Sequence, residues 1–461
     1  MCGPISKMKY DQIVVGLGPT GIAYALELER ARQPYALELE RARQQRVLFL
    51  EADERLGGCW KSHWDGPFFR EHSPKVLFRY GSPYFQSLLR RLEVSPRFRK
   101  VYAKNPTVSM MRPIFDGLSS MDLVRLLVYV VLIVVSRKES SITVEEWMDS
   151  HHITTSGKAF LSKLCLLVSN IPSKIRMNVF ARLFVSFAMF LSVDQMERPD
   201  EWLDVAHGRL ASNPEFDVRF RTKVTHIETL GTNATAVHTN HGERFEADRF
   251  VFCVPLRQME RVIERSSLRV RANWFGSFEI LHAFVEASTY AGIGFSLHFA
   301  DPVVFPQEWY WSGDGAWRVI VVDKTNTLGT YTRDPSIRRV WSCVIVDMDS
   351  KSDRLGATVH ECADMGVVVS EAIRQLREQY RKRLGFEFPS PYHVSMPHNV
   401  ARIDGAWRPW ESSYSNAAGT MPARGSTVSN LFSIGPHNLG EITVIDSAIR
   451  SALVFATHSN V

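Results

Sequence analysis

The stretch that decides the fold is Ile13-Val14-Val15-Gly16-Leu17-Gly18-Pro19-Thr20-Gly21, an apolar run that leads into a glycine-rich turn. A helical stretch follows it, and a second apolar run, Val47-Leu48-Phe49-Leu50, ends in Glu51. This order of strand, turn, helix and strand predicts a βαβ unit. The first glycine allows a tight turn, the second lets a pyrophosphate approach the backbone, and the third lets the helix pack close to the sheet.

The same stretch predicts which groups a ligand would meet. The helix start presents free N–H groups and the positive end of its dipole to phosphates. A carboxylate at the end of the second strand, here Glu51, can accept hydrogen bonds from both hydroxyls of an adenosine ribose. The stretch is therefore interpreted as a Rossmann-like dinucleotide-binding unit. A glycine-rich turn in another kind of α/β protein is the alternative.

A duplication explains an unusual spacing in this unit. Gly16 and Glu51 are 35 positions apart, more than the roughly 20 that are usual. Tyr24–Pro34 reads YALELERARQP and Tyr35–Gln45 reads YALELERARQQ, so ten of eleven positions are identical, and removing one copy leaves a spacing of 24. Eleven residues make about three helical turns, so an extra copy nearly preserves the buried face. Our hypothesis is that one copy is an insertion, either a helix extension kinked at Pro34 or a looped-out segment.

The residues after the second strand carry a family resemblance. Glu51-Ala52-Asp53-Glu54-Arg55-Leu56-Gly57-Gly58 resembles the E-A-x-x-R-x-G-G signature of the flavin-dependent amine oxidase superfamily. The resemblance implies FAD as the cofactor, with Arg55 and the Gly57-Gly58 backbone along its pyrophosphate and ribityl chain. Cys59 stands where the family often has arginine. The FAD contacts implied in this part of the chain are Gly16, Gly18, Pro19, Thr20, Gly21, Glu51, Ala52, Arg55, Gly57, Gly58, Cys59 and Trp60.

Two later segments match the places where the family returns to FAD. The residue matching Val224 would bond the adenine through its backbone. Near the end of the chain, a strand over 430–435 precedes a loop and a helix whose N-terminus would face the flavin pyrimidine. Gly435, Thr443, Val444 and Ile445 fall at the matching places, and Pro436 replaces the family's acid.

The fold class expected is α/β, a Rossmann-like FAD-binding domain of the glutathione-reductase type with an inserted α+β substrate domain. The FAD-binding domain would comprise residues 1–79, 214–265 and 398–461, and the substrate-binding domain residues 80–213 and 266–397. The second substrate segment should contain extended runs, among them Phe278–Val285 and Phe295–Phe299. A long helix over 359–384 should then stop at Gly385.

Composition limits the function classes. The net charge of +6 without a dense basic tract does not predict nucleic-acid binding, and six scattered cysteines without a CxxC motif predict neither a metal site nor disulfides. With no secretory segment at the start, an intracellular, cytoplasmic protein is expected. The longest apolar run, residues 126–135, is far shorter than the roughly 20 residues that span a bilayer. A buried helix or strand is favoured there, with a peripheral membrane contact or the wall of a lipophilic substrate tunnel left open.

The expected reaction is hydride transfer from an organic substrate, an amine or a lipophilic molecule, to non-covalently bound FAD. No second dinucleotide fingerprint is present for a nicotinamide cofactor, so O2 or another acceptor would reoxidise the flavin. The candidate catalytic residues are Lys324, Trp407, Trp410 and His72. A flavin-dependent isomerase or mutase, or a non-catalytic protein that retains the fold, are the alternatives. The oligomeric state is not predicted.

Overall fold

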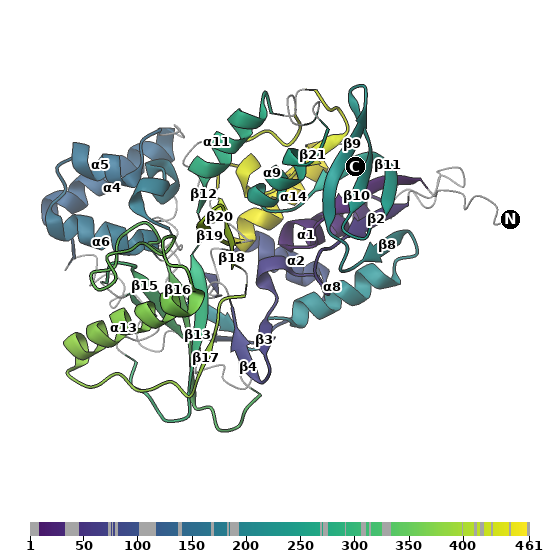
Figure 1. The fold of residues 1–461 in the computed structure, drawn as a ribbon. Helices are drawn as coiled ribbons and strands as arrows, with labels where there is room; N and C mark the ends of the chain where they lie inside the picture. The colour runs from purple at the N-terminus through teal and green to yellow at the C-terminus, as the bar shows by residue number, and fades with distance from the viewer. Residues whose placement is uncertain are drawn as a thin grey trace.

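A computed structural model gives the fold of the chain (Figure 1). The residues it describes are 9–32, 46–71, 75, 77–78, 82–100, 117–136, 141–166, 170–181, 184, 193–267, 270, 275–290, 292–305, 310–312, 315–324, 333–398, 400–409, 413–414, 419–425, 427–441 and 444–458.

The larger sheet contains the glycine-rich turn. Its strands run in the order β8-β2-β1-β11-β10-β9, and β21 also pairs with β11. The β1–β2, β2–β8, β1–β11 and β11–β21 pairs are parallel, whereas β9, β10 and the start of β11 form an antiparallel meander. The fold class predicted from the sequence is confirmed. The strands are β1 (Tyr10–Val15), β2 (Val47–Leu50), β8 (Phe216–Arg219), β9 (Val224–Leu230), β10 (Asn233–Thr239), β11 (Arg244–Phe252) and β21 (Leu431–Ser433).

Helices and the meander cover the two faces of this sheet. On one face, α1, α2, α8 and α14 share a core that includes Tyr24, Trp202 and Ile449. On the other face, the meander packs with α9 and α11 around Ile13 and Phe250. The purple α1 and the yellow α14 lie side by side in Figure 1, although they come from opposite ends of the chain. The helices are α1 (Pro19–Arg32), α2 (Pro83–Arg91), α8 (Glu201–Ser212), α9 (Leu256–Glu264), α11 (Phe278–Ser288) and α14 (Ile445–His458).

A second, antiparallel sheet lies apart from the first. Its order is β14-β15-β16-β13-β17, and the long helix α13 packs against it around Trp317 and Trp341. As predicted, α13 ends at Gly385, which has a φ of 75°. The helix begins at Met365, later than expected, because Asp364 caps it by accepting a hydrogen bond from the N–H of Gly366. These elements are β13 (Ile293–Phe299), β14 (Tyr310–Ser312), β15 (Val319–Asp323), β16 (Arg339–Ile345), β17 (His393–Ser395) and α13 (Met365–Leu384).

One extended run predicted from the sequence is wrong. Phe278–Val285 belongs to helix α11, whose N-cap Ser277 accepts a hydrogen bond from the N–H of Ile280. Leu281 and Val285 are buried four positions apart, which is the spacing of a helix face. Short apolar runs do not distinguish a strand from a buried helix, and the serine cap was the signal that could have separated them.

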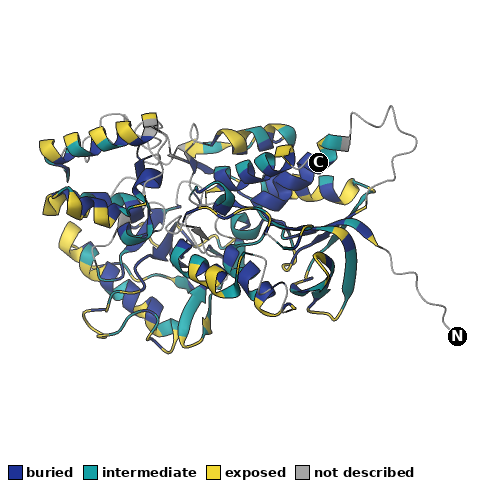
Figure 2. Cartoon of the chain, turned by 90° about the horizontal axis from the view of Figure 1, so that it is seen from above, coloured by how far each residue is buried: buried dark blue, intermediate teal, exposed yellow. Residues whose placement is uncertain are grey.

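A helical lobe projects at the left of Figure 1 and consists of α4 (Ser120–Ser136), α5 (Val144–Ser150), α6 (Thr155–Leu166) and η4 (Pro172–Lys174). Its core contains Leu126, Trp147 and Leu161. Thr143 and Glu146 form a capping box at the start of α5. The apolar run 126–135 lies within α4, with one face buried and the other exposed. Exposed residues gather on the outer sides of the helices of this lobe in Figure 2.

Short elements join these units. The remaining strands are β3 (His63–Asp65), β4 (Phe68–Arg70), β5 (Leu77–Phe78), β6 (Phe98–Lys100), β7 (Val193–Met196), β12 (Thr289–Tyr290), β18 (Val400–Ile403), β19 (Ala406–Pro409) and β20 (Ser413–Tyr414). The remaining short helices are η2 (Gly58–Trp60) and η6 (Pro436–Asn438). The predicted domain boundaries stay predictions.

The first copy of the duplicated segment continues α1 as far as Arg32. Its side chains are anchored: Tyr24 is buried against Phe455, and Glu27 pairs with Arg91. The second copy lies outside the described residues. Among the helices that the structure describes, none is long and apolar enough to span a bilayer.

Candidate functional site

The carboxyl ends of four parallel strands meet at one edge of the larger sheet. Backbone hydrogen bonds join the loops that follow these strands: Gly16 N–H to the Leu50 carbonyl at 2.8 Å, Cys253 N–H to the Val15 carbonyl at 2.7 Å, and Ile434 N–H to the Phe252 carbonyl at 2.9 Å. Ligands of open α/β sheets bind at this kind of edge. The turn after β1, Glu51 after β2 and Gly435 after β21 therefore share one site, although they lie far apart in the sequence.

The three glycines of the turn have two different roles, because two are required by the fold and one leaves space for a ligand. Gly16 has a φ of 93°, and a Cβ there would lie 2.9 Å from the carbonyl oxygen of Cys253. A Cβ on Gly21 would collide with the carbonyl oxygen of Gly16. A Cβ on Gly18 would meet its nearest heavy atom, the Cα of Gly58, at 3.9 Å, which is ordinary contact. The fold itself thus needs glycine at positions 16 and 21. At position 18, the absence of a side chain leaves room for a bound group.

Glu51 is fixed by the backbone around it. One carboxylate oxygen accepts from the N–H of Leu17 at 2.7 Å and the other from the N–H of Asp53 at 3.0 Å. The side chain is 7% exposed, and burial raises the pKa of this carboxyl group above its usual value, against the effect of those two hydrogen bonds. Each carboxylate oxygen has a second acceptor position, so the group can also receive ribose hydroxyls. This donor and acceptor pattern fits an adenosine ribose at the end of β2.

The Gly57-Gly58 loop lies directly against the glycine turn. The N–H of Gly57 donates to the Leu17 carbonyl at 2.8 Å, and a Cβ on Gly58 would come within 3.1 Å of the Cα of Gly18. Arg55 donates to Asp200, at 3.0 Å, and to the Ser62 carbonyl. Arg55 therefore ties this loop to the start of α8, and its contact with a pyrophosphate stays a prediction.

The other residues expected to contact FAD in this part of the chain lie at the start of α1, in η2 and directly after β2. Pro19 and Thr20 begin α1, and the hydroxyl of Thr20 donates to the Ala448 carbonyl of α14 at 3.1 Å. Cys59 and Trp60 form the short helix η2 with Gly58. Trp60 packs against Phe85, with ring centroids 5.8 Å apart. The side chain of Ala52 is exposed.

The C-terminal segment returns to the same edge of the sheet. The N–H of Gly435 donates to the side chain of Asn438 at 2.9 Å, and Asn438 donates to the Met421 carbonyl at 2.9 Å. Asn438 therefore orders the turn in which Pro436 replaces the family's acid. Val444 is exposed and immediately precedes α14, which begins at Ile445, whereas Thr443 lies outside the described residues. Val224 begins β9 and is opposite Thr239 of β10.

Asp446, in the first turn of α14, joins this helix to α2. Its Oδ1 accepts from the N–H groups of Tyr84 at 2.7 Å and Phe85 at 2.9 Å. Burial raises the pKa of the Asp446 carboxyl to about 6. The carboxylate is thus committed to the free N–H groups at the start of α2.

Lys324 lies in a buried cluster of charges beneath the Gly57-Gly58 loop. Its Nζ is 3.1 Å from Glu71 Oε1 and donates to the carbonyl oxygen of Lys75 at 3.0 Å. Lys75 Nζ in turn donates to the carbonyls of Trp60 and Lys61, at 2.8 and 2.7 Å. Burial lowers the pKa of both lysine ammonium groups, and the Glu71 carboxylate opposes that effect. Sequence reasoning missed Glu71 and Lys75, because no local pattern indicates that two distant segments pair in the interior.

Of the remaining catalytic candidates, the structure describes Trp407. Trp407 packs against the core of the second sheet, and its indole N–H donates to the Cys362 carbonyl at 2.8 Å. Trp407 therefore has a structural role in the second sheet. A contact between Trp407 and a flavin stays a prediction. Trp410 and His72 lie outside the described residues.

A buried histidine joins the hairpin β3–β4 to the second sheet. His298 Nε2 lies 2.9 Å from the Phe69 carbonyl oxygen and 3.1 Å from Ser395 Oγ. Burial lowers the pKa of this imidazole to about 4. His298 was not predicted from the sequence, where it is a lone polar residue in an apolar strand. Among the residues that the structure describes, no group of His, Cys, Asp and Glu is arranged to hold a metal ion.

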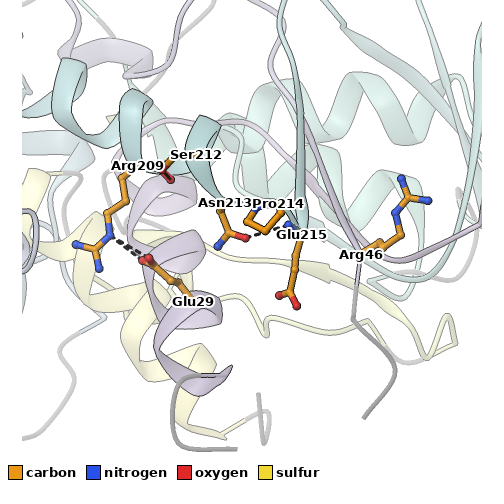
Figure 3. A pocket seen from close by; sticks show the side chains of 7 residues that line it. All are labelled: Glu29, Arg46, Arg209, Ser212, Asn213, Pro214 and Glu215. Carbon is orange, nitrogen blue, oxygen red and sulfur yellow. Dashed lines mark hydrogen bonds and ion pairs between the residues drawn. The ribbon is translucent and has the colours of Figure 1, made fainter. Parts of the chain in front are cut away.

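A hollow of about 470 Å³ lies at the opposite edge of the larger sheet (Figure 3). Arg46 precedes β2 and Glu215 precedes β8, so this hollow is at the amino ends of the strands. Arg209 reaches from α8 to Glu29 on α1, with a shortest distance of 2.9 Å. The hollow therefore lies at the opposite edge of the sheet from the glycine turn and Glu51.

Comparison with known proteins gives a match to one family model and a set of solved structures with the same fold. Residues 186–398 match the model of the family described as flavin containing amine oxidoreductase. No curated protein sequence matches the chain significantly. The matched range covers a little less than half of the chain and excludes the segment from Glu51 to Gly58.

Solved structures share the fold over nearly the whole chain. An oxidoreductase from Methanosarcina mazei has a TM-score of 0.64 at 14% identity, with 98% of this chain and 100% of that chain covered. Putrescine oxidase bound to putrescine has a TM-score of 0.62 at 14% identity, with 98% and 99% covered. A protein from Pyrococcus furiosus has a TM-score of 0.60 at 14% identity, with 97% of each chain covered. At this identity, these likenesses show the fold alone.

Together the findings confirm the resemblance to the flavin-containing amine oxidase superfamily. They also support FAD as the cofactor and oxidoreduction as the general activity. The glycine turn, the open approach at Gly18 and the anchored carboxylate of Glu51 fit that cofactor.

Proposed function

We propose that this relative of the flavin-containing amine oxidoreductases removes a hydride from an amine, with O2 or another acceptor completing the cycle. The match of residues 186–398 to that family carries the proposal. A structural neighbour, putrescine oxidase, has been solved with the amine putrescine bound, which supports the same choice. A lipophilic substrate is the second candidate, favoured by the apolar core of the helical lobe.

The chain's own residues would hold and orient the cofactor. FAD, when bound, supplies a two-electron hydride acceptor, and the protein supplies orientation and electrostatics. The first N–H groups of α1 would hold the pyrophosphate, and Glu51 would accept from the adenosine ribose. The N-terminus of α14, at Val444 and Ile445, would place positive partial charges near the flavin pyrimidine, where reduction adds negative charge.

We further propose that the cofactor is held without a covalent bond. Two described cysteines lie near the glycine turn, Cys59 in η2 and Cys253 after β11, and burial raises the pKa of the Cys253 thiol well above the usual range. A neutral, buried thiol is a poor nucleophile. The cysteines that the structure describes are all free, which supports a reducing, intracellular setting.

The buried cluster of Lys324, Glu71 and Lys75 would position the loop beside the cofactor. Lys75 fixes the carbonyls of Trp60 and Lys61 directly after the Gly57-Gly58 loop, and Lys324 fixes the backbone of Lys75. This cluster connects β15 of the second sheet to the loop against the glycine turn. A direct part of Lys324 in proton transfer stays a prediction.

The first experiment is a visible absorption spectrum of the purified protein before and after denaturation. The two-banded spectrum of oxidised flavin, with cofactor released on unfolding, would establish non-covalent binding. Anaerobic mixing with putrescine, spermidine, benzylamine or a carotenoid polyene would then identify substrates that bleach the flavin. Bleaching by an amine, with H2O2 formed in air, supports the proposal.

Each other outcome has a definite meaning. Bleaching by the polyene alone would favour the lipophilic substrate. A flavin that only dithionite reduces would favour an isomerase or mutase. A colourless protein that cannot be reconstituted with FAD would contradict enzyme function and favour a non-catalytic protein that retains the fold.

A further inference from the structure

We propose that the outer face of α4 docks onto an anionic lipid bilayer, with the helix lying in the plane of the membrane surface. The proposal rests on the geometry of this helix and its surrounding charges, and it is independent of the substrate. The structure describes seventeen exposed large hydrophobic side chains, and seven of them lie on α4. The seven are Met121, Val124, Leu127, Val128, Val131, Leu132 and Val135.

These seven side chains form one continuous face. At 3.6 residues per turn, they fall within an arc of about 140° and extend along about 21 Å of the helix. Val135 is 77% exposed, and the others are between 45% and 59% exposed. The one polar residue of α4 within the arc is Ser120, the first residue of the helix. Scattered single hydrophobic side chains are normal on protein surfaces, but a contiguous apolar face indicates an interaction site.

The opposite side of α4 fixes its orientation. Leu126, Val130 and Ile133 are buried in the core of the lobe, together with Trp147 of α5 and Leu161 of α6. The helix is therefore apolar around most of its circumference, a pattern usual for a helix covered on all sides. Within the part of the chain that the structure describes, only half of the helix is covered, and the other half is available to a partner.

The character of the face favours lipid over a second copy of the chain. Protein interfaces contain hydrogen bonds and are enriched in aromatic and arginine side chains. This face holds only Val, Leu and Met side chains, which offer no hydrogen bond to fix a partner's register. In addition, a helix of a protein partner would cover only a narrow strip of this face, whereas lipid acyl chains can contact the full arc.

Charge around the face complements an anionic surface. The two ionisable residues of α4 are Asp122 and Arg125. Asp122 is buried and accepts a hydrogen bond from the Thr154 hydroxyl at 2.5 Å, whereas Arg125 is partly exposed at the rim of the arc. Among the residues of the lobe that the structure describes, five Lys and Arg stand against three exposed Asp and Glu, because the fourth carboxylate, Asp122, is buried. Basic side chains near an apolar face add attraction to anionic headgroups, worth about 1 kcal/mol each near the surface.

The geometry suits a shallow, in-plane contact. No described helix could span a bilayer, and α4 itself is 17 residues long, about 25 Å. An interfacial helix buries its apolar face about 5–10 Å into the boundary between headgroups and acyl chains. The lobe lies at the left of Figure 1, apart from the larger sheet at the right.

The test is co-sedimentation of the full-length protein with vesicles, using phosphatidylcholine alone and phosphatidylcholine with 30% phosphatidylserine. We expect stronger binding to the anionic vesicles, with part of that gain lost in high salt. The double variant Val128→Asp/Leu132→Asp should bind at least about tenfold more weakly. The matched control, Ile280→Asp/Val367→Asp, places the same charges at exposed hydrophobic sites on α11 and α13 and should bind like the wild type.

A second measurement reports the contact directly and guards against misfolding. Leu132→Cys labelled with an environment-sensitive fluorophore should shift its emission to the blue on adding anionic vesicles, whereas Val367→Cys should not. An unchanged emission at position 132, or wild-type binding by Val128→Asp/Leu132→Asp, would overturn the proposal. A lipid-free dimer that the same variant converts to a monomer would overturn it in favour of a second copy of this chain.

Discussion

Lys324 Nζ lies 3.1 Å from Glu71 Oε1, and neither side chain is exposed to solvent. The two residues are 253 positions apart in the sequence, and they join β15 of the second sheet to the segment after hairpin β3–β4. Taking two charges out of water is costly, and their mutual attraction offsets that cost only while both are present.

Removing one partner of this pair should cost more than removing both. Lys324→Met leaves the Glu71 carboxylate buried without its partner, so we expect a loss of about 3–5 kcal/mol in stability. Lys324→Met/Glu71→Leu should recover much of that loss. Thermal unfolding of the wild type, both single variants and the double variant measures this directly. Additive losses in the double variant would show that the two side chains do not stabilise each other.

Gly18 should matter for flavin and not for folding. Because an added Cβ meets nothing closer than 3.9 Å, Gly18→Ala should leave the melting temperature of the flavin-free protein nearly unchanged. The methyl group would occupy the space for the pyrophosphate, so FAD retained after gel filtration should fall by about tenfold or more. Gly208→Ala on α8, where a Cβ meets nothing within 4 Å, is the control and should retain FAD. Full FAD retention by Gly18→Ala would place the cofactor elsewhere.

Deleting residues 24–34 should preserve both the fold and FAD binding. The second copy would then follow Ala23 directly and supply the same buried tyrosine and leucines in the same register. FAD content and melting temperature should match those of the full chain. Deleting residues 24–45 removes both copies, together with the packing of Tyr24 on Phe455, and should prevent folding. Loss of FAD in the shorter deletion would mean that the duplication is integral to the site.

His298 should make the protein less stable in mild acid. Burial lowers the pKa of His298 from 6.5 to about 4, so between these values the unfolded chain binds a proton that the folded chain does not. Its stabilising contribution is complete above pH 6.5 and is lost as the pH falls toward 4, by on the order of 2 kcal/mol.

His298→Gln removes this titration while retaining a donor for the Phe69 carbonyl. The fall in melting temperature between pH 6.5 and pH 4.5 should therefore be smaller in this variant. His437, whose pKa burial also lowers to about 4, would account for part of the remaining fall. His458→Gln at the exposed end of α14 is the control and should keep the wild-type slope. An identical slope in His298→Gln and the wild type would contradict the assignment.

The sequence by itself determined the βαβ unit, the position of Glu51 at a strand end, the end of the long helix at Gly385, and the resemblance to the flavin-containing amine oxidases. Each depends on residues within one or two neighbouring elements, where backbone conformation and local hydrogen bonds decide the outcome. The same local signals misled at Phe278–Val285, because a short apolar run suits a strand or a helix until its packing partners are known.

Only the tertiary structure decided which side chains share the interior. It paired Lys324 with Glu71, committed Arg55 to Asp200, and placed Trp407 against the core of the second sheet. It also decided which half of α4 is buried. The sequence of α4 does not specify this, because the helix is apolar around most of its circumference. These outcomes depend on contacts between segments far apart in the chain, and their energies arise from burial and charge pairing that exist only after the segments have packed.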